Sequence, residues 1–340
     1  MNLRVTNKML STSFLRDMNN NLANLQELQQ QMTSGKEIRR PSDNPFKVAR
    51  AMQLHSSINA NKQYNENISD TINWLDTTDT ALGQVGDVLQ RIRELIVSAG
   101  NASYSENERR AIKDEINEKI GEIAQILNTN FDGKYIFGGT RGTTKPVDAA
   151  PDPSTNNTKL FYNSRSGTEL DPNSTDVDVQ NELNMIKGKM SVEISQGVSM
   201  EYNVTAADII EFTSEDGTKY NLMELLTNIT NHLDGKDNDG NPDTDKALEL
   251  LNKSDLKGIT DTINNLLKIR SEVGAKQNRM DSAKLRNEEE TFNMTEILSQ
   301  TEDIDITEKT MQYATMQVVY MASLQTSARV LQPTLMDYLR

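Results

Sequence analysis

The sequence contains no cysteine, only two histidines and a single tryptophan among its 340 residues. The absence of cysteine excludes disulfide bonds, thiolate metal sites and cysteine nucleophiles. The histidines, His55 and His232, are too few for a histidine-rich metal cluster and leave little basis for a Ser-His-Asp triad. No glycine-rich phosphate-binding motif follows a predicted strand. The sequence therefore predicts neither an enzyme nor a cofactor site, and we expect both histidines to be surface or interface residues.

Long apolar runs are also missing, since hydrophobic residues make up only 35% of the chain. No stretch approaches the roughly 18 apolar residues of a membrane span. The N-terminal segment is interrupted by Arg4, Lys8 and Arg16, so it lacks the apolar core of a cleavable secretion signal. This composition is typical of long helices that each carry one narrow apolar stripe.

The net charge of −14 is concentrated in one part of the chain. Residues 151–250 carry 19 acidic and seven basic side chains, whereas the remaining residues carry 31 acidic and 29 basic side chains. An acidic chain lacks the basic face that nucleic-acid phosphates require. The charge therefore predicts a solvated middle region and argues against nucleic acid as a partner.

Apolar residues recur every three or four positions in predicted helices at both ends of the chain. The first helix is expected from Leu3 to about Ser34, and the last begins at the capping pattern Asp305–Glu308. Pro333 predicts a bend or an early end in the last helix. A single narrow stripe is unstable alone, so each predicts a contact with another helix. The stripe residues are Leu10, Phe14, Met18, Leu22, Leu25, Leu28 and Met32, with Met311, Ala314, Val318, Met321, Leu324, Ala328, Leu331 and Leu335.

Two long helices and a shorter one are predicted between these ends. The first is expected from about Pro45 to Ala99, with Ser42 and Asp43 as candidate N-caps, and its apolar residues alternate in steps of three and four like a coiled-coil seam. The capping box Ser105–Glu108 begins a further helix. A long helix is expected from about Ser254 to near Gln300.

The segment between these helices is rich in proline, asparagine and short alternating runs, which indicates a small, separate β-rich domain with one helix near Leu222–Leu233. Its acidic loop, residues 234–246, partly resembles an EF-hand loop, in which Asp237 and Asp239 would be calcium ligands. Lys246 stands where that loop requires a bidentate glutamate, so an acidic turn is the alternative.

The predicted fold is mainly α, with N- and C-terminal helices paired into antiparallel coiled-coil arms and an inserted β-rich domain. Residues 1–40 and 303–340 are expected to form a terminal-helix domain. Residues 41–140 and 254–302 are expected to form a long-helix coiled-coil domain with a β turn. Residues 141–253 are expected to form the acidic, outward-facing domain.

Several motifs resemble those of the flagellin superfamily, in the right order over both ends of the chain. They are TSGKEIRRPSDNP at residues 33–45, YIFGGT at 135–140 and SEVGAKQNRMDSA at 271–283. Filament-forming members usually carry alanine where Pro41 and Pro45 stand. YIFGGT and the residues Arg40, Pro41, Ser42, Asp43 and Pro45 therefore resemble the branch that joins hook to filament, whereas Pro333 departs from the family pattern.

The resemblance implies a structural subunit of the extracellular bacterial flagellum, exported unfolded by the flagellar type III apparatus. Implied partners are copies of itself in a ring, hook-associated protein one, flagellin and a cytoplasmic export chaperone on the C-terminal helix. The two apolar stripes would be the interfaces for these partners. No cofactor and no membrane insertion are implied.

Three alternatives remain open from the sequence. The chain could be a filament subunit of the same family, a surface adhesin that uses its acidic middle domain, or an enzyme carried on that domain. In addition, Gln90, Arg91 and Leu95 align with residues of flagellin that contact an animal flagellin-sensing toll-like receptor. The alternative for this stretch is an ordinary helix with Ile92 buried in the seam.

Overall fold

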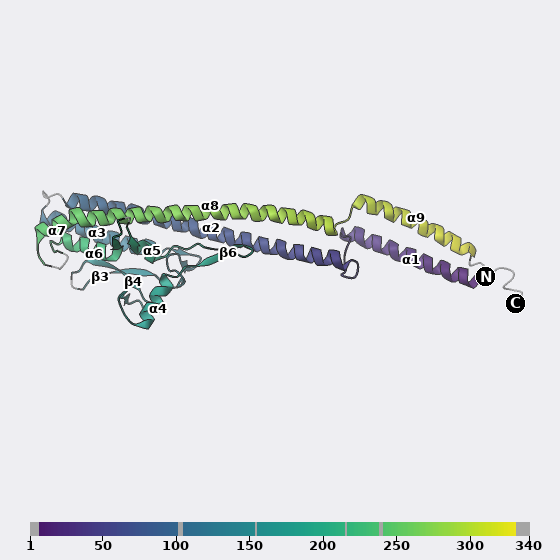
Figure 1. Ribbon diagram of the computed structural model, residues 1–340, viewed down its shortest axis with the longest axis horizontal. Helices are drawn as coiled ribbons and strands as arrows, with labels where there is room; N and C mark the ends of the chain where they lie inside the picture. Colours follow the sequence, from purple (N-terminus) through teal and green to yellow (C-terminus); the bar gives the residue numbers. More distant parts are fainter. Residues whose placement is uncertain (1–6, 101–104, 154, 215, 238–240, 331–340) are drawn as a thin grey trace. The chain divides into compact units, whose positions relative to one another are not determined.

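The protein is mostly helical, with small antiparallel sheets in its middle region, so the predicted fold class is confirmed (Figure 1). The structure is a computed structural model that describes residues 7–100, 105–153, 155–214, 216–237 and 241–330. The chain divides into two compact units. Unit 1 contains α1, α9, the start of α2 and the end of α8, and unit 2 comprises residues 62–288.

Long helices make up most of both units. In unit 1, α1 and α9 run antiparallel, and in unit 2, α2 and α8 do the same (Figure 1). Helix α2 begins and ends at the predicted residues, and α8 begins within two residues of its predicted start. The bounds are α1 Asn7–Ser34, α2 Pro45–Ala99, α3 Glu106–Leu127, α8 Leu256–Glu302 and α9 Ile306–Val330.

The helix ends follow the capping signals of the sequence. The Ser105 hydroxyl accepts a hydrogen bond from the backbone N–H of Glu108, and the Glu108 carboxylate accepts one from the N–H of Ser105, so the capping box is confirmed. The Asp305 carboxylate accepts from the N–H of Thr307 at 2.8 Å and caps α9. Gly35 ends α1 with a φ of 73°, a conformation that glycine adopts without a steric penalty.

The middle region combines short strands with short helices. Strands β3, β4 and β5 form one antiparallel sheet, and β1–β2, β6–β7 and β8–β9 form two-stranded antiparallel sheets. The strands are β1 Asn130–Phe131, β2 Lys134–Tyr135, β3 Val147–Pro151, β4 Thr158–Asn163, β5 Glu169–Leu170, β6 Ser191–Ser195, β7 Val198–Glu201, β8 Glu211–Thr213 and β9 Lys219–Asn221. The helices are α4 Val177–Ile186, α5 Ala206–Ile210, α6 Leu222–Leu233, α7 Thr244–Leu250 and a π-helical turn at Leu251–Asp255.

The expectation of one helix in this region is therefore wrong. Helix α6 has the predicted bounds, but α4, α5 and α7 were not predicted because they are too short for a repeating apolar stripe. Their starts are set instead by side-chain caps. Asp176, Thr205 and Asp243 accept hydrogen bonds from the first turns of α4, α5 and α7, respectively.

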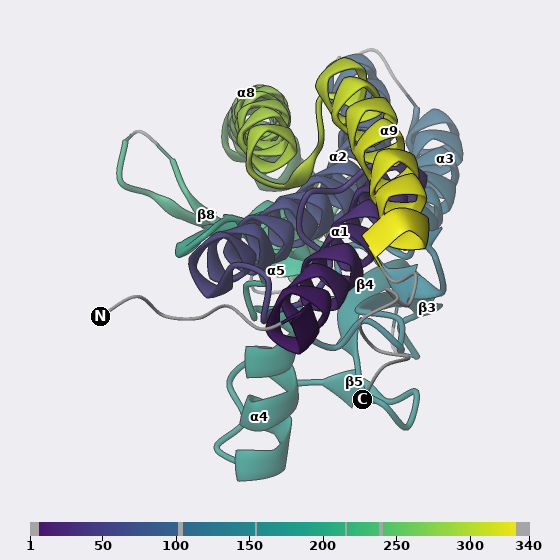
Figure 2. The same cartoon turned by 90° about the vertical axis from the view of Figure 1, so that its right-hand side faces the viewer.

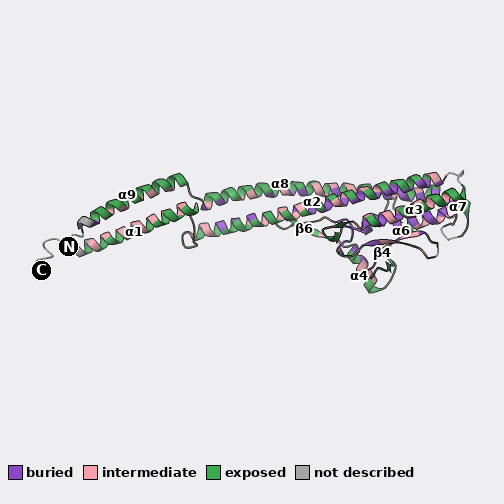
Figure 3. Ribbon diagram, turned by 180° about the vertical axis from the view of Figure 1, so that it is seen from behind, coloured by how far each residue is buried: buried purple, intermediate pink, exposed green. Residues whose placement is uncertain are grey.

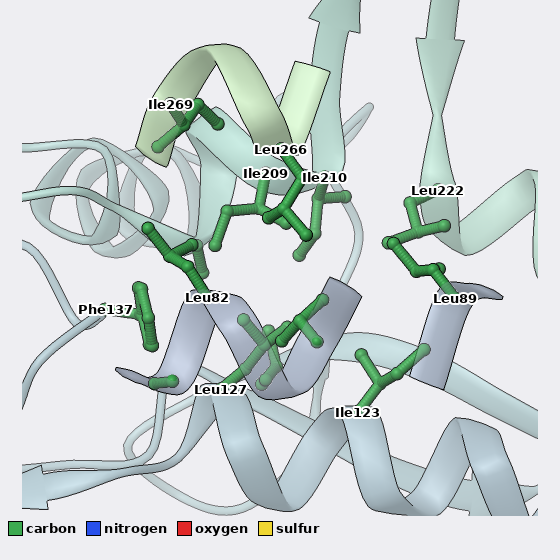
Figure 4. Close-up of a cluster of buried hydrophobic side chains, with 14 of the residues drawn as sticks. Leu82, Leu89, Ile123, Leu127, Phe137, Ile209, Ile210, Leu222, Leu266 and Ile269 are labelled. Carbon is green, nitrogen blue, oxygen red and sulfur yellow. The ribbon is translucent and has the colours of Figure 1, made fainter. Parts of the chain in front are cut away.

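The core of unit 2 forms around α2, which lies between α3 and α8 (Figure 2). Leu82 of α2 is fully buried with Leu127 of α3 on one side and Leu266 of α8 on the other (Figure 4). Ile210 of the middle region and Leu222 of α6 belong to the same cluster. The strands are too short to enclose a core of their own, so the middle region packs against the long helices. The division into three domains stays a prediction.

A matched pair of leucine variants tests the importance of this core. Leu82→Ala removes a fully buried side chain, and we expect it to lower the free energy of unfolding by about 2–5 kcal/mol. Leu285→Ala alters a side chain that is 67% exposed on α8 and should change the same quantity by less than about 0.5 kcal/mol. Urea unfolding of the full chain, followed by circular dichroism, measures both. Equal changes for the two variants would contradict this account of the core.

Candidate assembly interface

Helices α1 and α9 contact each other in unit 1 through the predicted stripe of α1. The described members of this stripe are half-buried, whereas most residues between them are exposed. The Ser327 hydroxyl of α9 lies 3.8 Å from the sulfur of Met18 on α1. The half-buried members are Phe14, Met18, Leu22, Leu25, Leu28 and Met32, and the side chain of Leu10 lies outside the described residues.

Helix α9 contacts α1 through a face that the sequence analysis missed. Tyr313, Met316, Tyr320 and Ser323 are half-buried and Ser327 is buried. Their steps of three and four place them along one side of the helix. The same spacing could have identified this face. Because it contains two tyrosines and two serines, this face is less apolar than the predicted stripe.

The predicted stripe of α9 lies on the opposite, exposed side of the helix (Figure 3). Met311 is 65% exposed and Val318 is 62% exposed, and Ala314, Met321 and Leu324 are also exposed. Helix α9 therefore has one apolar face toward α1 and a second apolar face without a partner in the described chain. The side chain of Ala328, together with Leu331, Pro333 and Leu335, lies outside the described residues.

The linker that follows α1 and the linker that precedes α9 are hydrogen-bonded to each other. The backbone N–H of Glu37 donates to the carbonyl of Glu302 at 2.6 Å, and the N–H of Ile304 donates to the carbonyl of Gly35 at 3.1 Å. The Lys36 ammonium forms an ion pair with the Glu302 carboxylate. These contacts join the α1–α2 linker to the α8–α9 linker, so the end of α1 and the start of α9 are held together.

The predicted motif residues lie on the surface of the first linker. Arg40, Pro41, Ser42, Asp43 and Pro45 are all exposed. The Asp43 carboxylate accepts hydrogen bonds from the backbone N–H of Arg40 at 2.8 Å and of Arg39 at 3.2 Å. These donors stabilise the charged carboxylate and hold the pKa of Asp43 below its ordinary value.

The cap of α2 differs from the expected one. Asn44, rather than Ser42 or Asp43, accepts a hydrogen bond from the backbone N–H of Lys47 at 3.1 Å. The Asp43 carboxylate instead points its acceptors toward the backbone of the linker. The proline-containing motif therefore closes its own turn before the helix begins.

The YIFGGT motif has a structural role in unit 2. Its residues Ile136 and Phe137 are fully buried, and the Phe137 carbonyl accepts a hydrogen bond from the N–H of Ala206 at 2.9 Å. Gly139 has a φ of 60°, and a Cβ added there would lie 2.3 Å from the carbonyl oxygen of Ile186. The motif requires glycine at this position because the end of α4 packs directly on its backbone.

Two segments of the chain match known regions of one family. Residues 5–141 match the bacterial flagellin N-terminal helical region, and residues 256–339 match the bacterial flagellin C-terminal helical region. The chain belongs to the flagellin superfamily. The two matches cover the helices that form the arms, and the middle region lies between them.

Relatives within the flagellin superfamily match nearly the whole chain. The flagellar hook-associated protein 3 of Salmonella typhimurium is 22% identical over 325 residues, which cover 95% of this chain and 96% of the relative. A flagellin of Clostridium tyrobutyricum is 25% identical over 358 residues, which cover 91% of this chain and 94% of the relative. The crystal structure of flagellar hook-associated protein 3 from Legionella pneumophila has a TM-score of 0.58 at 14% identity, and the match covers 73% of this chain and 98% of that one.

As a member of the flagellin superfamily, the protein is a structural component of the bacterial flagellum. The solved structure shows that the fold is shared. No helix in the described part of the chain is long and apolar enough to span a membrane.

In the acidic loop, Lys246 forms an ion pair with Asp237, one of the two candidate calcium ligands. The buried Asp237 carboxylate accepts a hydrogen bond from the N–H of Asn241 at 2.9 Å and lies 2.8 Å from the Lys246 ammonium. Asp239 lies outside the described residues. Within residues 7–237 and 241–330, apart from the short gaps, no group of three or more acidic, histidine or cysteine side chains is placed to hold a metal. The metal-binding role of Asp237 and Asp239 stays a prediction.

The three residues aligned with the receptor-contacting stretch of flagellin differ in exposure. Gln90 and Arg91 are exposed, whereas Leu95 is buried and Ile92 is fully buried in the seam of α2. The Arg91 guanidinium forms ion pairs with Glu94 and Glu115. Receptor recognition stays a prediction, and of the three aligned residues Gln90 and Arg91 present accessible side chains.

The histidines occupy unlike environments. His55 is half-exposed, with its Nε2 3.4 Å from the Glu302 carboxylate. His232 is buried, with its Nδ1 2.5 Å from the carboxylate of Asp255, so the expectation of a surface or interface residue is wrong for His232. Burial raises the pKa of Asp255, although the neighbouring imidazole opposes this effect. The pair joins α6 to the π-helical turn and has a structural role there.

The hydrogen bonds to Asp43 predict a measurable titration. The pKa of Asp43 is lower in the folded protein than the value of 3.8 expected in the unfolded chain. Ionised Asp43 therefore stabilises the fold at pH values above 3.8, and this stabilisation is lost as the pH falls through the lower pKa of the folded protein. An NMR titration of the Asp43 carboxyl carbon should therefore give a midpoint below 3.8. In Ser42→Ala the backbone donors remain, so the midpoint should stay below that value. A midpoint at or above 3.8 in both proteins would refute the proposed cause.

Proposed function

We propose that this chain is the structural subunit that joins the flagellar hook to the flagellin filament. The observation that supports assembly is the second apolar face of α9, formed by Met311, Ala314, Val318, Met321 and Leu324, which is exposed in the single chain. A row of exposed apolar side chains is unfavourable in water, and its burial against another subunit is favourable. Copies of this chain in a ring would provide that partner.

The proposed position at the junction rests on the motifs and on the relatives. The linker motif with Pro41 and Pro45, followed by YIFGGT, favours the junction branch over the filament branch. The full-length match to hook-associated protein 3 agrees with this assignment. Sequence identity alone does not distinguish a junction subunit from a filament subunit, since a flagellin is 25% identical to this chain. The filament subunit therefore remains the second candidate.

The proposed neighbours are hook-associated protein one on the hook side and flagellin on the filament side. Before export, a cytoplasmic chaperone would cover the exposed face of α9, because an amphipathic helix is readily held in an apolar groove. The absence of cysteine is compatible with export as an unfolded chain, since no disulfide has to be opened. The proposed location is therefore extracellular, at the hook–filament boundary.

A pair of charge variants tests whether the exposed face of α9 mediates assembly. Val318→Glu places a carboxylate in the apolar face and should abolish assembly, because the charge would have to be buried without a partner. Gln312→Glu places the same charge on α9 outside that face and should assemble at near wild-type levels. Filament formation on cells and oligomer size by light scattering measure the effect.

Circular dichroism should be unchanged in both α9 variants, since both side chains are exposed in the single chain. Normal assembly of Val318→Glu, or equal loss in the two variants, would rule out a specific role of this face. Met321→Glu provides a second substitution within the same face.

The junction role predicts a specific cellular phenotype. Deleting the gene should leave cells with hooks but without filaments, while filament protein accumulates in the medium. Immunogold labelling of the restored protein should mark the hook–filament boundary. Normal filaments after deletion would refute the junction role, and labelling along the whole filament would favour the filament subunit.

A further inference from the structure

A pocket in unit 2 is lined by aromatic rings from separate parts of the chain. Trp74 comes from α2, Phe131 from the β1–β2 hairpin and Tyr202 from the segment after β7. The ring centroids of Phe131 and Tyr202 lie 6.0 and 5.9 Å from that of Trp74, at interplanar angles of 83° and 86°. At these distances the rings pack edge to face against Trp74 instead of forming a flat stack, and all three residues line the pocket.

The chain holds these aromatic walls in fixed positions. Trp74 is 7% exposed and belongs to the main core of unit 2, and Phe131 and Tyr202 pack against the same core. The backbone N–H of Tyr202 donates to the carbonyl of Met190 at 3.1 Å. Within the described residues, the indole N–H of Trp74 has no acceptor. The pocket is therefore preformed, which lowers the entropic cost of binding a ligand.

The rim of the pocket is acidic. Asp70 of α2 and Asp132 of the hairpin turn both line it, with Lys134 as the single basic residue. Both carboxylates are exposed, and neither forms an ion pair with another described residue. The rim thus carries two negative charges and one positive charge, so the field at the pocket favours a cation.

We propose that this pocket binds an alkylammonium group. The faces of tryptophan, tyrosine and phenylalanine attract such a cation, and nearby carboxylates strengthen the attraction. A neutral apolar group would gain only the contact with the rings, and an anion would be repelled by the rim. The group could be the head of a lysine side chain from another protein or a small quaternary ammonium compound, since both present the same chemistry.

The only tryptophan of the chain lies in this pocket, so its fluorescence reports on binding directly. The full-length protein is titrated with choline and, separately, with Nα-acetyl-lysine methylamide. The neutral isosteres 3,3-dimethylbutan-1-ol and the Nα-acetyl methylamide of 2-aminoheptanoic acid serve as controls for size and apolar contact. We expect a saturable change in Trp74 emission with at least one cation and none with its isostere, and weaker binding at high salt.

Substitutions on the rim separate the pocket from general surface charge. Asp132 has a φ of 50°, a conformation that asparagine also adopts readily, so Asp132→Asn should fold normally. It should weaken cation binding by about fivefold. Asp114→Asn removes an exposed carboxylate of α3 outside the pocket and should leave binding unchanged. Tyr202→Leu removes one aromatic wall but keeps the reporter, and it should weaken binding by about tenfold.

The relative affinities identify the source of the cation. Tighter binding of the lysine amide supports a protein partner, and tighter binding of choline supports a small quaternary ammonium ligand. No fluorescence response to either cation, or an equal response to the neutral isosteres, overturns the proposal. Equal weakening by Asp132→Asn and Asp114→Asn would also overturn it, because the effect would then be one of overall charge.

Discussion

The structure depends on the burial of one apolar seam along α2. Its residues from Ile68 to Ala99 recur in steps of three and four, and nearly all of them are buried in unit 2. Each such side chain contributes about 1.5–3 kcal/mol when fully removed from water. Helices α3 and α8 cover this seam from two sides, and the short elements of the middle region complete the cover. Most of the stability of α2 therefore comes from packing against its neighbours.

The same principle explains why the terminal helices differ from the rest. Where three or more elements surround α2, nearly all of its seam is buried. Within the described residues, α1 and α9 pack mainly on each other, and most of their contact residues are half-buried. Two helices in contact can cover only one face each. The second apolar face of α9 is therefore exposed in the single chain. This geometry is suited to a subunit whose terminal helices pack against neighbouring copies.

The sequence predicted the elements that repeat over several turns. The bounds of α2 and α6, the capping box of α3 and the start of α8 follow from periodicity and local hydrogen bonding. The sequence did not reveal α4, α5 and α7, which are too short to show a period. It also missed the α1-facing side of α9, because Tyr313, Tyr320 and Ser327 are half polar, and it missed the aromatic pocket around Trp74, whose walls come from segments far apart in the chain.

The distribution of charge completes the argument for assembly through the helical arms. Some of the acidic side chains of the middle region hold it to the helices, as in the pairs Asp234–Lys113 and Asp216–Lys257. The remaining negative charge of this region would repel the same region of a neighbouring copy, since like charges disfavour contact. The helical segments at both ends are nearly neutral and experience no such repulsion. Electrostatic repulsion and apolar burial therefore favour the same arrangement, in which copies meet through their terminal helices and keep their acidic regions in water.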